Sequence, residues 1–144
     1  MTLRPIVLAA FISAAAGPQI SGAEVDTSPK PGGVLKLKPG VYVSQWQSCA
    51  DPANAALRIY NGKGIRGSAT HDCVARIVKA RNNHFTVDQS CIDTPAGAGK
   101  RTTERQTITV RNALEFVLEN GAHSSTYHYC PTYELPTWLR STHL

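Results

Sequence analysis

The chain has 144 residues, with 15 Lys and Arg against 10 Asp and Glu, a formal net charge of +5 at pH 7 and 17% charged residues. This length suits one domain with a modest core, and the positive charge is spread along the chain. Because the sequence has no basic run with interleaved aromatic residues, we expect no nucleic-acid partner.

The N-terminus carries the pattern of a secretory signal peptide. Arg4 is followed by an apolar run over 5–16. This run is too short to span a bilayer, which takes about 20 residues. The small residues "SGA" at 21–23 favour removal of 1–23, although cleavage after Ala16 also fits. We therefore expect a periplasmic or secreted protein that keeps no membrane span after signal cleavage.

Beyond this point the chain divides into three parts. Residues 24–40 hold three prolines and three glycines and predict an extended leader. Residues 41–130 predict one β domain. The tail, 131–144, predicts one short helical turn around Trp138 and Leu139, which either docks on the outside of the domain or closes one end of it.

Within the β domain, short apolar runs alternate with turn residues such as Asp-Pro and Asn-Gly. The runs lie at 41–46, 55–60, 65–69, 73–80, 84–92, 105–111, 113–119 and 124–130. In the fifth run, Phe85, Val87 and Gln89 fall on one side of an extended chain. Alternation with period two and β-branched or aromatic residues is typical of strands. We expect an all-β fold: an antiparallel up-and-down meander of seven or eight strands, closed into a small barrel or folded as a sandwich.

Three glycines in "YNGKGIRG", Gly62, Gly64 and Gly67, form a literal G-x-G-x-x-G. This pattern binds dinucleotides when it follows a strand and opens a helix. Here Asn61-Gly62 lies between two apolar stretches, which is a strong hairpin signal. The chain after Gly67 leads into another strand, with no helix to hold a phosphate. The glycines therefore predict a turn and not a nucleotide site.

All four cysteines, Cys49, Cys73, Cys91 and Cys130, follow the expected signal peptide. An even number in an oxidising compartment predicts two disulfides, and the absence of a C-x-x-C spacing argues against a zinc site. Three pairings are open. An up-and-down strand order slightly favours Cys49–Cys73 with Cys91–Cys130. The close alternative is Cys73–Cys91, because these residues lie opposite each other if "RNN" at 81–83 is a hairpin tip.

The titratable residues form no catalytic or metal-binding pattern. In "THDC" only His71 and Cys73 could converge, since neighbours in a strand point to opposite faces, and a disulfide would occupy the thiol. The five histidines lack helical ligand spacing, and there is no G-x-S-x-G. No close pair of acidic residues resembles a glycosidase site. We expect no enzyme activity, no cofactor and no metal.

The expected signal peptide, the run "PGVYVSQWQSC" at 39–49 and a second cysteine that opens a later strand form a familiar outline. In these features the chain resembles the small calycin-like β-barrels of the bacterial periplasm, which include protease and lysozyme inhibitors. The resemblance implies a small barrel with a binding role. It carries over no functional residues, because the S-G-x-x-Y motif of one lysozyme-inhibitor family is absent. The chain is also basic, whereas an inhibitor of a basic lysozyme would be acidic.

We expect a non-catalytic binding protein, an inhibitor or protein-interaction module for an unknown protein partner. Loops on a rigid scaffold commonly carry recognition. The basic residues of loops 61–67 and 93–103 are therefore the candidates for partner contact: Lys63, Arg66, Lys100 and Arg101. The alternative is a carrier of a lipid or another small apolar ligand inside the barrel, since eight strands can enclose one small molecule. The lining residues expected for a carrier are Trp46, Phe116, Tyr127 and Tyr129.

Overall fold

The computed structural model describes Gly22 and residues 24–141. The expected signal peptide, 1–23, lies outside the described residues except for Gly22. The elements in chain order are β1 (Gly40–Ser44), a 3₁₀ turn (Asn54–Ala56), β2 (Leu57–Tyr60), β3 (Ile65–Arg66), β4 (His71–Arg81), β5 (His84–Ile92), β6 (Arg101–Asn112), β7 (Glu115–Asn120), β8 (His123–Cys130), a second 3₁₀ turn (Thr132–Glu134) and α1 (Thr137–Arg140). Within this described part, no helix combines the length and apolar character needed to cross a bilayer.

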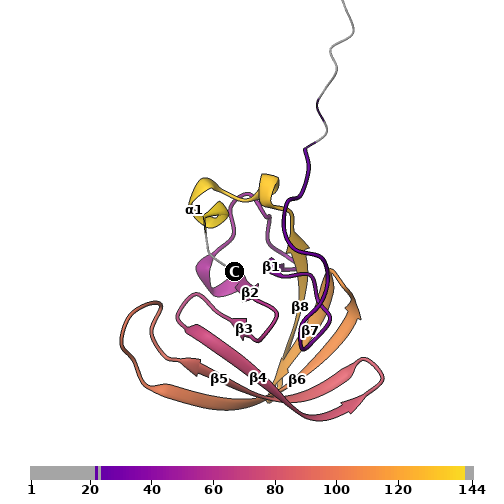
Figure 1. Ribbon diagram of the computed structural model, residues 1–144, viewed down its shortest axis with the longest axis vertical. Coiled ribbons are helices and arrows are strands. Elements are labelled where there is room, and N and C mark those ends of the chain that lie inside the picture. The colour runs from indigo at the N-terminus through magenta and orange to yellow at the C-terminus, as the bar shows by residue number, and fades with distance from the viewer. Residues whose placement is uncertain (1–21, 23, 142–144) are drawn as a thin grey trace, which may run out of the picture.

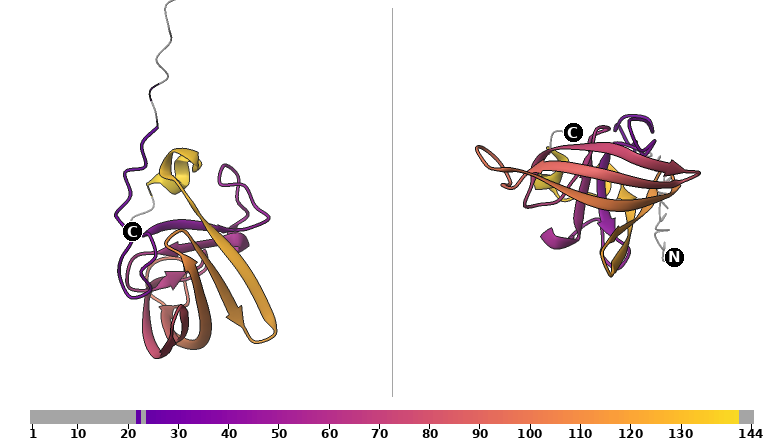
Figure 2. Two further views of the ribbon diagram at one scale, coloured as in Figure 1. Left: turned by 90° about the vertical axis from the view of Figure 1, so that its right-hand side faces the viewer. Right: turned by 90° about the horizontal axis from the view of Figure 1, so that it is seen from below.

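Eight antiparallel strands form a nearly closed barrel (Figure 1), which confirms the predicted fold class and decides for the barrel over the sandwich. Strands β4 to β8 pair in chain order, as do β1 to β3, and β1 also pairs with β8. The seam between β3 and β4 is held by Ala75 N, which donates to Lys63 O at 2.8 Å. The side chain of Gln89 also reaches the seam, donating from Nε2 to Ile65 O. The long strands β4, β5 and β6 form one curved wall of the barrel (Figure 2).

The glycine-rich stretch forms the turn between β2 and β3. Asn61 Oδ1 accepts hydrogen bonds from Lys63 N and Gly64 N, both at 2.9 Å. Gly62 has φ +87°, a left-handed conformation that glycine adopts without strain. The strands on either side then pair antiparallel. The predicted hairpin is confirmed.

An apolar core fills part of the barrel interior. The rings of Tyr42 and Phe116, both fully buried, meet edge to face with their centroids 5.2 Å apart. The segment 24–40, for which we expected an extended leader, contributes Leu35 and Leu37, both 0% exposed. Full burial of a leucine side chain is worth about 1.5–3 kcal/mol. The segment before β1 is therefore part of the folded domain.

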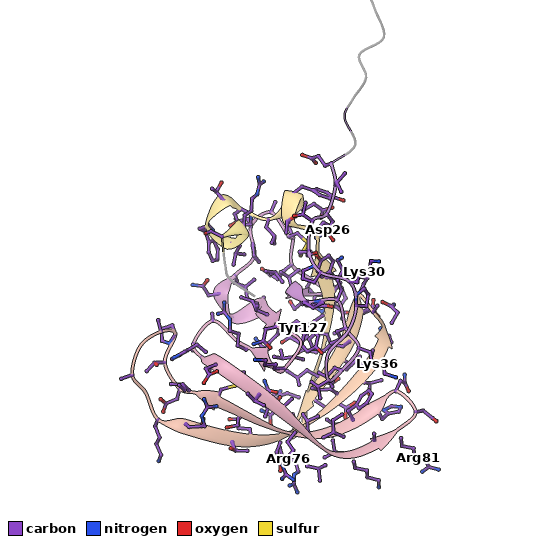
Figure 3. The ribbon with its side chains drawn as sticks, viewed as in Figure 1. Asp26, Lys30, Lys36, Arg76, Arg81 and Tyr127 are labelled. Carbon is purple, nitrogen blue, oxygen red and sulfur yellow. A yellow bond between two sulfur atoms is a disulfide. The ribbon has the colours of Figure 1, made fainter. Side chains whose placement is uncertain are left out.

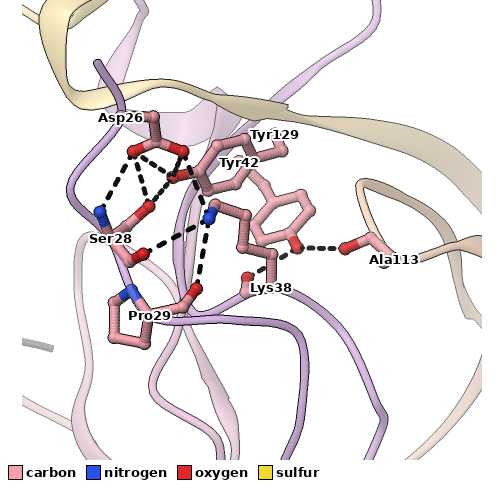
Figure 4. Close-up of polar contacts among 7 residues, drawn as sticks. All are labelled: Asp26, Ser28, Pro29, Lys38, Tyr42, Ala113 and Tyr129. Atoms are coloured by element: carbon pink, nitrogen blue, oxygen red, sulfur yellow. Dashed lines mark hydrogen bonds and ion pairs between the residues drawn. The ribbon is translucent and has the colours of Figure 1, made fainter.

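A polar cluster fastens the start of the described chain to β8 (Figure 4). The Asp26 carboxylate accepts hydrogen bonds from Tyr129 Oη at 2.9 Å and from Ser28 Oγ at 2.6 Å, and it pairs with Lys38 Nζ at 3.3 Å. Burial alone would raise the pKa of the Asp26 carboxyl, but the hydrogen bonds outweigh burial and lower this pKa to about 2. Burial raises the pKa of the Tyr129 phenol to about 12. At neutral pH the carboxylate is thus charged and the phenol is a donor.

A second apolar cluster lies outside the barrel, where the tail covers β1 and β2. Its members are Val41, Val43, Cys49, Leu57, Ile59, Cys130, Leu135 and Leu139. The tail forms the single helical turn predicted around Trp138 and Leu139 and docks on the outside, because Leu139 is buried in this cluster. Beside it, residues 27–29 and Arg140 line one small cavity of about 200 Å³. The two ends of the described chain therefore lie together.

The two predicted disulfides are present, but the favoured pairing was wrong. Cys49 is bonded to Cys130, with their Cα atoms 5.6 Å apart, and Cys73 is bonded to Cys91. The pairing of β1 with β8 places Cys130 opposite Val41 at the start of β1. The loop after β1 then returns to the outer apolar cluster, where Cys49 packs with Val41 and Cys130. The second disulfide follows from the β4–β5 hairpin, whose tip is at 82–83 and whose two strands carry the two cysteines. The alternative Cys73–Cys91 pairing is confirmed.

Candidate ligand-binding site

Part of the barrel interior is not filled by side chains and forms a cavity of about 600 Å³. Its walls come from β2, β3 and β5 to β8 and from the turn at 67–70. Most of the residues that line it carry polar side chains: Arg58, Ser68, Thr70, Gln89, Thr102, Glu104, Gln106, Asn120, His123, Ser125 and Tyr127. The cavity is therefore a polar compartment beside the apolar core.

Strand alternation explains how these polar side chains reach the interior. On β6, Ile108 belongs to the core, and Gln106 and Glu104 have the same parity, so they face the same side of the sheet. The register confirms this placement, because Gln106 lies opposite the buried Val87. The same change occurs on β7, from Leu118 to Asn120, and on β8, from Tyr127 to Ser125 and His123. The inner face of the sheet thus turns from apolar to polar along these strands.

The positive charge in the cavity comes from Arg58 on β2. Its guanidinium carbon lies 5.0 Å from the ring centroid of Tyr127, an arrangement that attracts the cation to the ring face. Arg58 Nη1 donates to the backbone oxygens of Leu57 at 2.7 Å and Ala55 at 3.2 Å. Among the described residues, no carboxylate lies within 4.0 Å of this guanidinium. The charge of Arg58 is held in place but not neutralised.

The opposite wall carries hydrogen-bond acceptors. Glu104 on β6 lies directly across from Gln89 on β5. Gln89 is only 4% exposed, and its Oε1 accepts no hydrogen bond from the described residues. An acceptor buried without a donor costs about 1–3 kcal/mol. The Glu104 carboxylate accepts one hydrogen bond, from Gln106 Nε2 at 3.3 Å, and forms no ion pair within the described part of the chain.

The four aromatic residues predicted to line the interior lie in three different environments. Tyr127 lines the cavity and lies inside the barrel in Figure 3. Phe116 is fully buried in the core, where it stacks on Tyr127 with the centroids 5.2 Å apart. Tyr129 is also in the core and is bonded to Asp26. Trp46 lies after the end of β1 and is 83% exposed. Of the four, only Tyr127 lines the large cavity.

The four basic loop residues do not line the cavity. Lys63 and Lys100 are exposed in the turn after β2 and in the loop before β6. Arg101 pairs with Asp72 on the neighbouring β4. Arg66 is half-buried, and burial lowers the pKa of its guanidinium. None of the four therefore reaches a ligand inside the barrel.

One group of potential metal ligands occurs in the described residues: Cys49, His128 and Cys130. The two cysteines are joined to each other, and His128 Nε2 lies 3.8 Å from Cys49 Sγ. A thiol in a disulfide cannot bind a metal as a thiolate, so this group offers one ligand only.

No family model, curated protein or solved structure matches this chain.

Proposed function

We propose that the chain is an exported, non-catalytic binding protein that holds a small polar ligand inside the barrel. The observation that carries this proposal is the 600 Å³ cavity with its polar inner face. Sites for small molecules are usually concave spaces of about 300–1,000 Å³ with convergent polar groups. The size of this cavity fits that description, and its lining is more polar than usual, which favours a polar ligand.

The polar inner face of the barrel includes one buried group, Gln89, that is difficult to explain by folding alone. An eight-stranded barrel can fill its interior with side chains, and Tyr42, Phe116 and Ile108 do so in the apolar part. At the other positions, Gln106, Glu104 and other polar residues face inward and leave space between them. Glu104 and Asn120 are exposed to solvent, whereas Gln89 is only 4% exposed and its Oε1 has no donor among the described residues. A buried polar group costs free energy unless it is hydrogen-bonded, which favours a ligand that supplies the missing donor.

The same lining favours a polar ligand over the apolar ligand or lipid that we expected for a carrier. A lipid chain would cover the free N–H groups of Arg58 and the carboxylate of Glu104 with apolar surface, and it would leave Gln89 Oε1 without a donor. The cost is about 1–3 kcal/mol for each neutral polar group and more for the charged ones. A ligand with its own donors and acceptors would satisfy them.

Export is supported by the two disulfides, which form and persist in oxidising compartments. The signal-like N-terminal sequence points to the same place, the periplasm or the medium.

Native mass spectrometry of the protein purified from its own host tests the proposal. We expect wild-type protein to retain a small molecule in addition to the mass of the chain. Ser125→Trp fills the cavity from β8 and should lose the added mass. Ser124→Trp is the matched control, because Ser124 lies opposite Glu119 on the outer face. A bare mass for the wild type, or an added mass that survives Ser125→Trp, contradicts the proposal.

A protein partner remains the second candidate because of one surface feature. Trp46 is 83% exposed and lies three residues before Cys49, whose disulfide holds the loop in place. Exposed aromatic side chains on a fixed loop are typical of binding hot spots. If this loop binds a protein, Trp46→Ala should abolish capture of that protein from periplasmic extract, while Val78→Ala, at an exposed apolar residue of β4, should leave it intact.

A further inference from the structure

We infer that the cavity takes a zwitterionic ligand of the size of a short peptide, with its carboxylate at Arg58 and its ammonium at Glu104 and Gln89. This inference rests on the proposed binding function and names the class of ligand.

The strand order places the two charged walls opposite each other. The barrel runs β1 to β8 in a ring, since β1 pairs with β8 and the seam joins β3 to β4. Strands β2 and β6 are separated by three strands in either direction around this ring. Arg58 on β2 and Glu104 on β6 line the same cavity, and neither forms an ion pair within the described residues. A ligand between them meets a cation on one side and a carboxylate on the other.

The free edge of the Arg58 guanidinium suits a carboxylate. Only Nη1 donates to backbone oxygens, those of Ala55 and Leu57. Nε and Nη2 have no acceptor among the described residues. An arginine presents two parallel N–H groups that match the two oxygens of a carboxylate. Contact with the Tyr127 ring fixes the plane of the guanidinium, so less side-chain entropy is lost when the ligand binds.

The opposite wall suits an ammonium group. Glu104 and Gln89 are a cross-strand pair on the inner face, and side chains in such pairs lie within contact of each other. Gln89 Nε2 donates to Ile65 O, which directs the amide so that Oε1 is left without a donor. An ammonium has three donors and no acceptor. It can bond the carboxylate of Glu104 and supply a donor for Gln89 Oε1 after a small rotation of the amide.

The neutral part of the lining suits peptide groups. Between the two charged walls, β7 and β8 contribute Asn120 and Ser125, and the turn after β3 contributes Ser68 and Thr70. These side chains both donate and accept hydrogen bonds, as peptide N–H and C=O groups do. A free amino acid would fill only part of about 600 Å³, whereas a peptide of a few residues would use more of this space.

Calorimetric titration with triglycine, N-acetyl-triglycine, triglycine amide and the neutral sugar maltotriose tests the inference. We expect triglycine to bind and either blocking group to weaken binding by at least tenfold. Arg58→Gln should weaken triglycine binding to the level of the amide while leaving binding of the amide unchanged. Glu104→Gln should do the same with respect to N-acetyl-triglycine. Arg105→Gln and Glu119→Gln are matched controls on the outer face and should bind as wild type.

The remaining results of the titration would each overturn the zwitterionic ligand. Equal binding of free and blocked peptides, or binding of maltotriose alone, overturns the zwitterion and leaves the polar-ligand function standing. If none of the four probes binds to folded wild-type protein, the inference fails, and the retained mass in native mass spectrometry decides the proposed function separately. The comparison of free and blocked probes uses wild-type protein only, so a variant that does not fold cannot obscure the result.

Discussion

At the scale of single residues, the Asp26 carboxylate is the strongest polar anchor of the chain's N-terminal side. It joins Ser28, Lys38 and Tyr129, and its pKa falls to about 2. The ordinary value is 3.8. Because the pKa is lower in the folded state, this carboxyl stabilises the fold fully above about pH 4. The contribution is lost as the pH falls from about 4 to about 2.

We expect Asp26→Asn to lower the free energy of unfolding by about 1–2 kcal/mol at pH 7, because it removes the charge that the cluster stabilises. Urea denaturation at pH 7, 4, 3 and 2 measures this difference, which should shrink toward zero at pH 2. Asp51→Asn, in an exposed turn, is the control and should change little. A difference that stays constant with pH would show that the loss is not electrostatic.

The Tyr60 hydroxyl carries a second residue-scale prediction. Its oxygen accepts from Leu35 N at 3.0 Å and its hydrogen is within reach of Gly32 O at 2.9 Å, so it holds the 32–37 turn inside the barrel. Tyr60→Phe leaves the buried Leu35 N–H without an acceptor and should lower the free energy of unfolding by about 1–3 kcal/mol. Denaturation midpoints measure the effect. A stability equal to that of the control Tyr133→Phe would mean that water replaces the hydroxyl.

The sequence could predict part of the candidate site. Tyr127 was identified because it lies two residues from another aromatic on a strand. The polar lining was missed, although the signal was present: extending the parity of Ile108 back along its strand gives Gln106 and Glu104. Trp46 was placed inside because its strand was taken to reach residue 46, whereas β1 ends at Ser44. Whether a side chain near the end of a strand points into the barrel thus depends on where the strand ends, and the apolar runs of the sequence do not define that position.

At the scale of elements, the two disulfides differ in what they constrain. Cys73–Cys91 joins the two strands of one hairpin across 18 residues, while Cys49–Cys130 spans 81 residues and joins the loop after the first strand to the end of the last. Loop-closure entropy predicts about 3 kcal/mol for the shorter loop and about 4.5 kcal/mol for the longer one. The longer loop is therefore the more important constraint on the unfolded chain.

We expect the double variant Cys49→Ala/Cys130→Ala to lose about 1 kcal/mol more stability than Cys73→Ala/Cys91→Ala. Chemical denaturation of the two variants under identical conditions measures the difference. The reverse order would indicate that strain relief or denatured-state structure outweighs chain entropy.

The strands themselves were predictable, but their long-range partners were not. Each of the eight expected runs overlaps an observed strand, since alternation is a local property. Which cysteines meet is decided by the pairing of β1 with β8, a contact between residues such as Val41 and Cys130 that no local pattern encodes. The hairpin that joins Cys73 and Cys91 is local, and that pairing was within reach of the sequence as the close alternative.

At the scale of the whole molecule, the barrel closes at its shortest strand. Across the seam, Ala75 N donates to Lys63 O and Gln89 donates to Ile65 O.

We expect Gln89→Leu to speed hydrogen exchange at the Ala75 amide by about tenfold, the effect of losing one hydrogen bond near 1.4 kcal/mol. Amides paired between β5 and β6 should exchange as in wild type. Hydrogen exchange measured by NMR tests this prediction. The control is Gln106→Leu, which removes a side-chain amide from the inner face at a position away from the seam, and it should leave exchange at the Ala75 amide unchanged.

The shared small cavity at 27–29 and Arg140 places the beginning and the end of the folded chain side by side. A short glycine-serine bridge could therefore connect Glu24 to Ser141, and the backbone could be opened instead within the exposed stretch 95–100. Such a circularly permuted polypeptide would keep all eight strands with their pairings, and both disulfides. Its native topology does not require the covalent order in which the strands are synthesised.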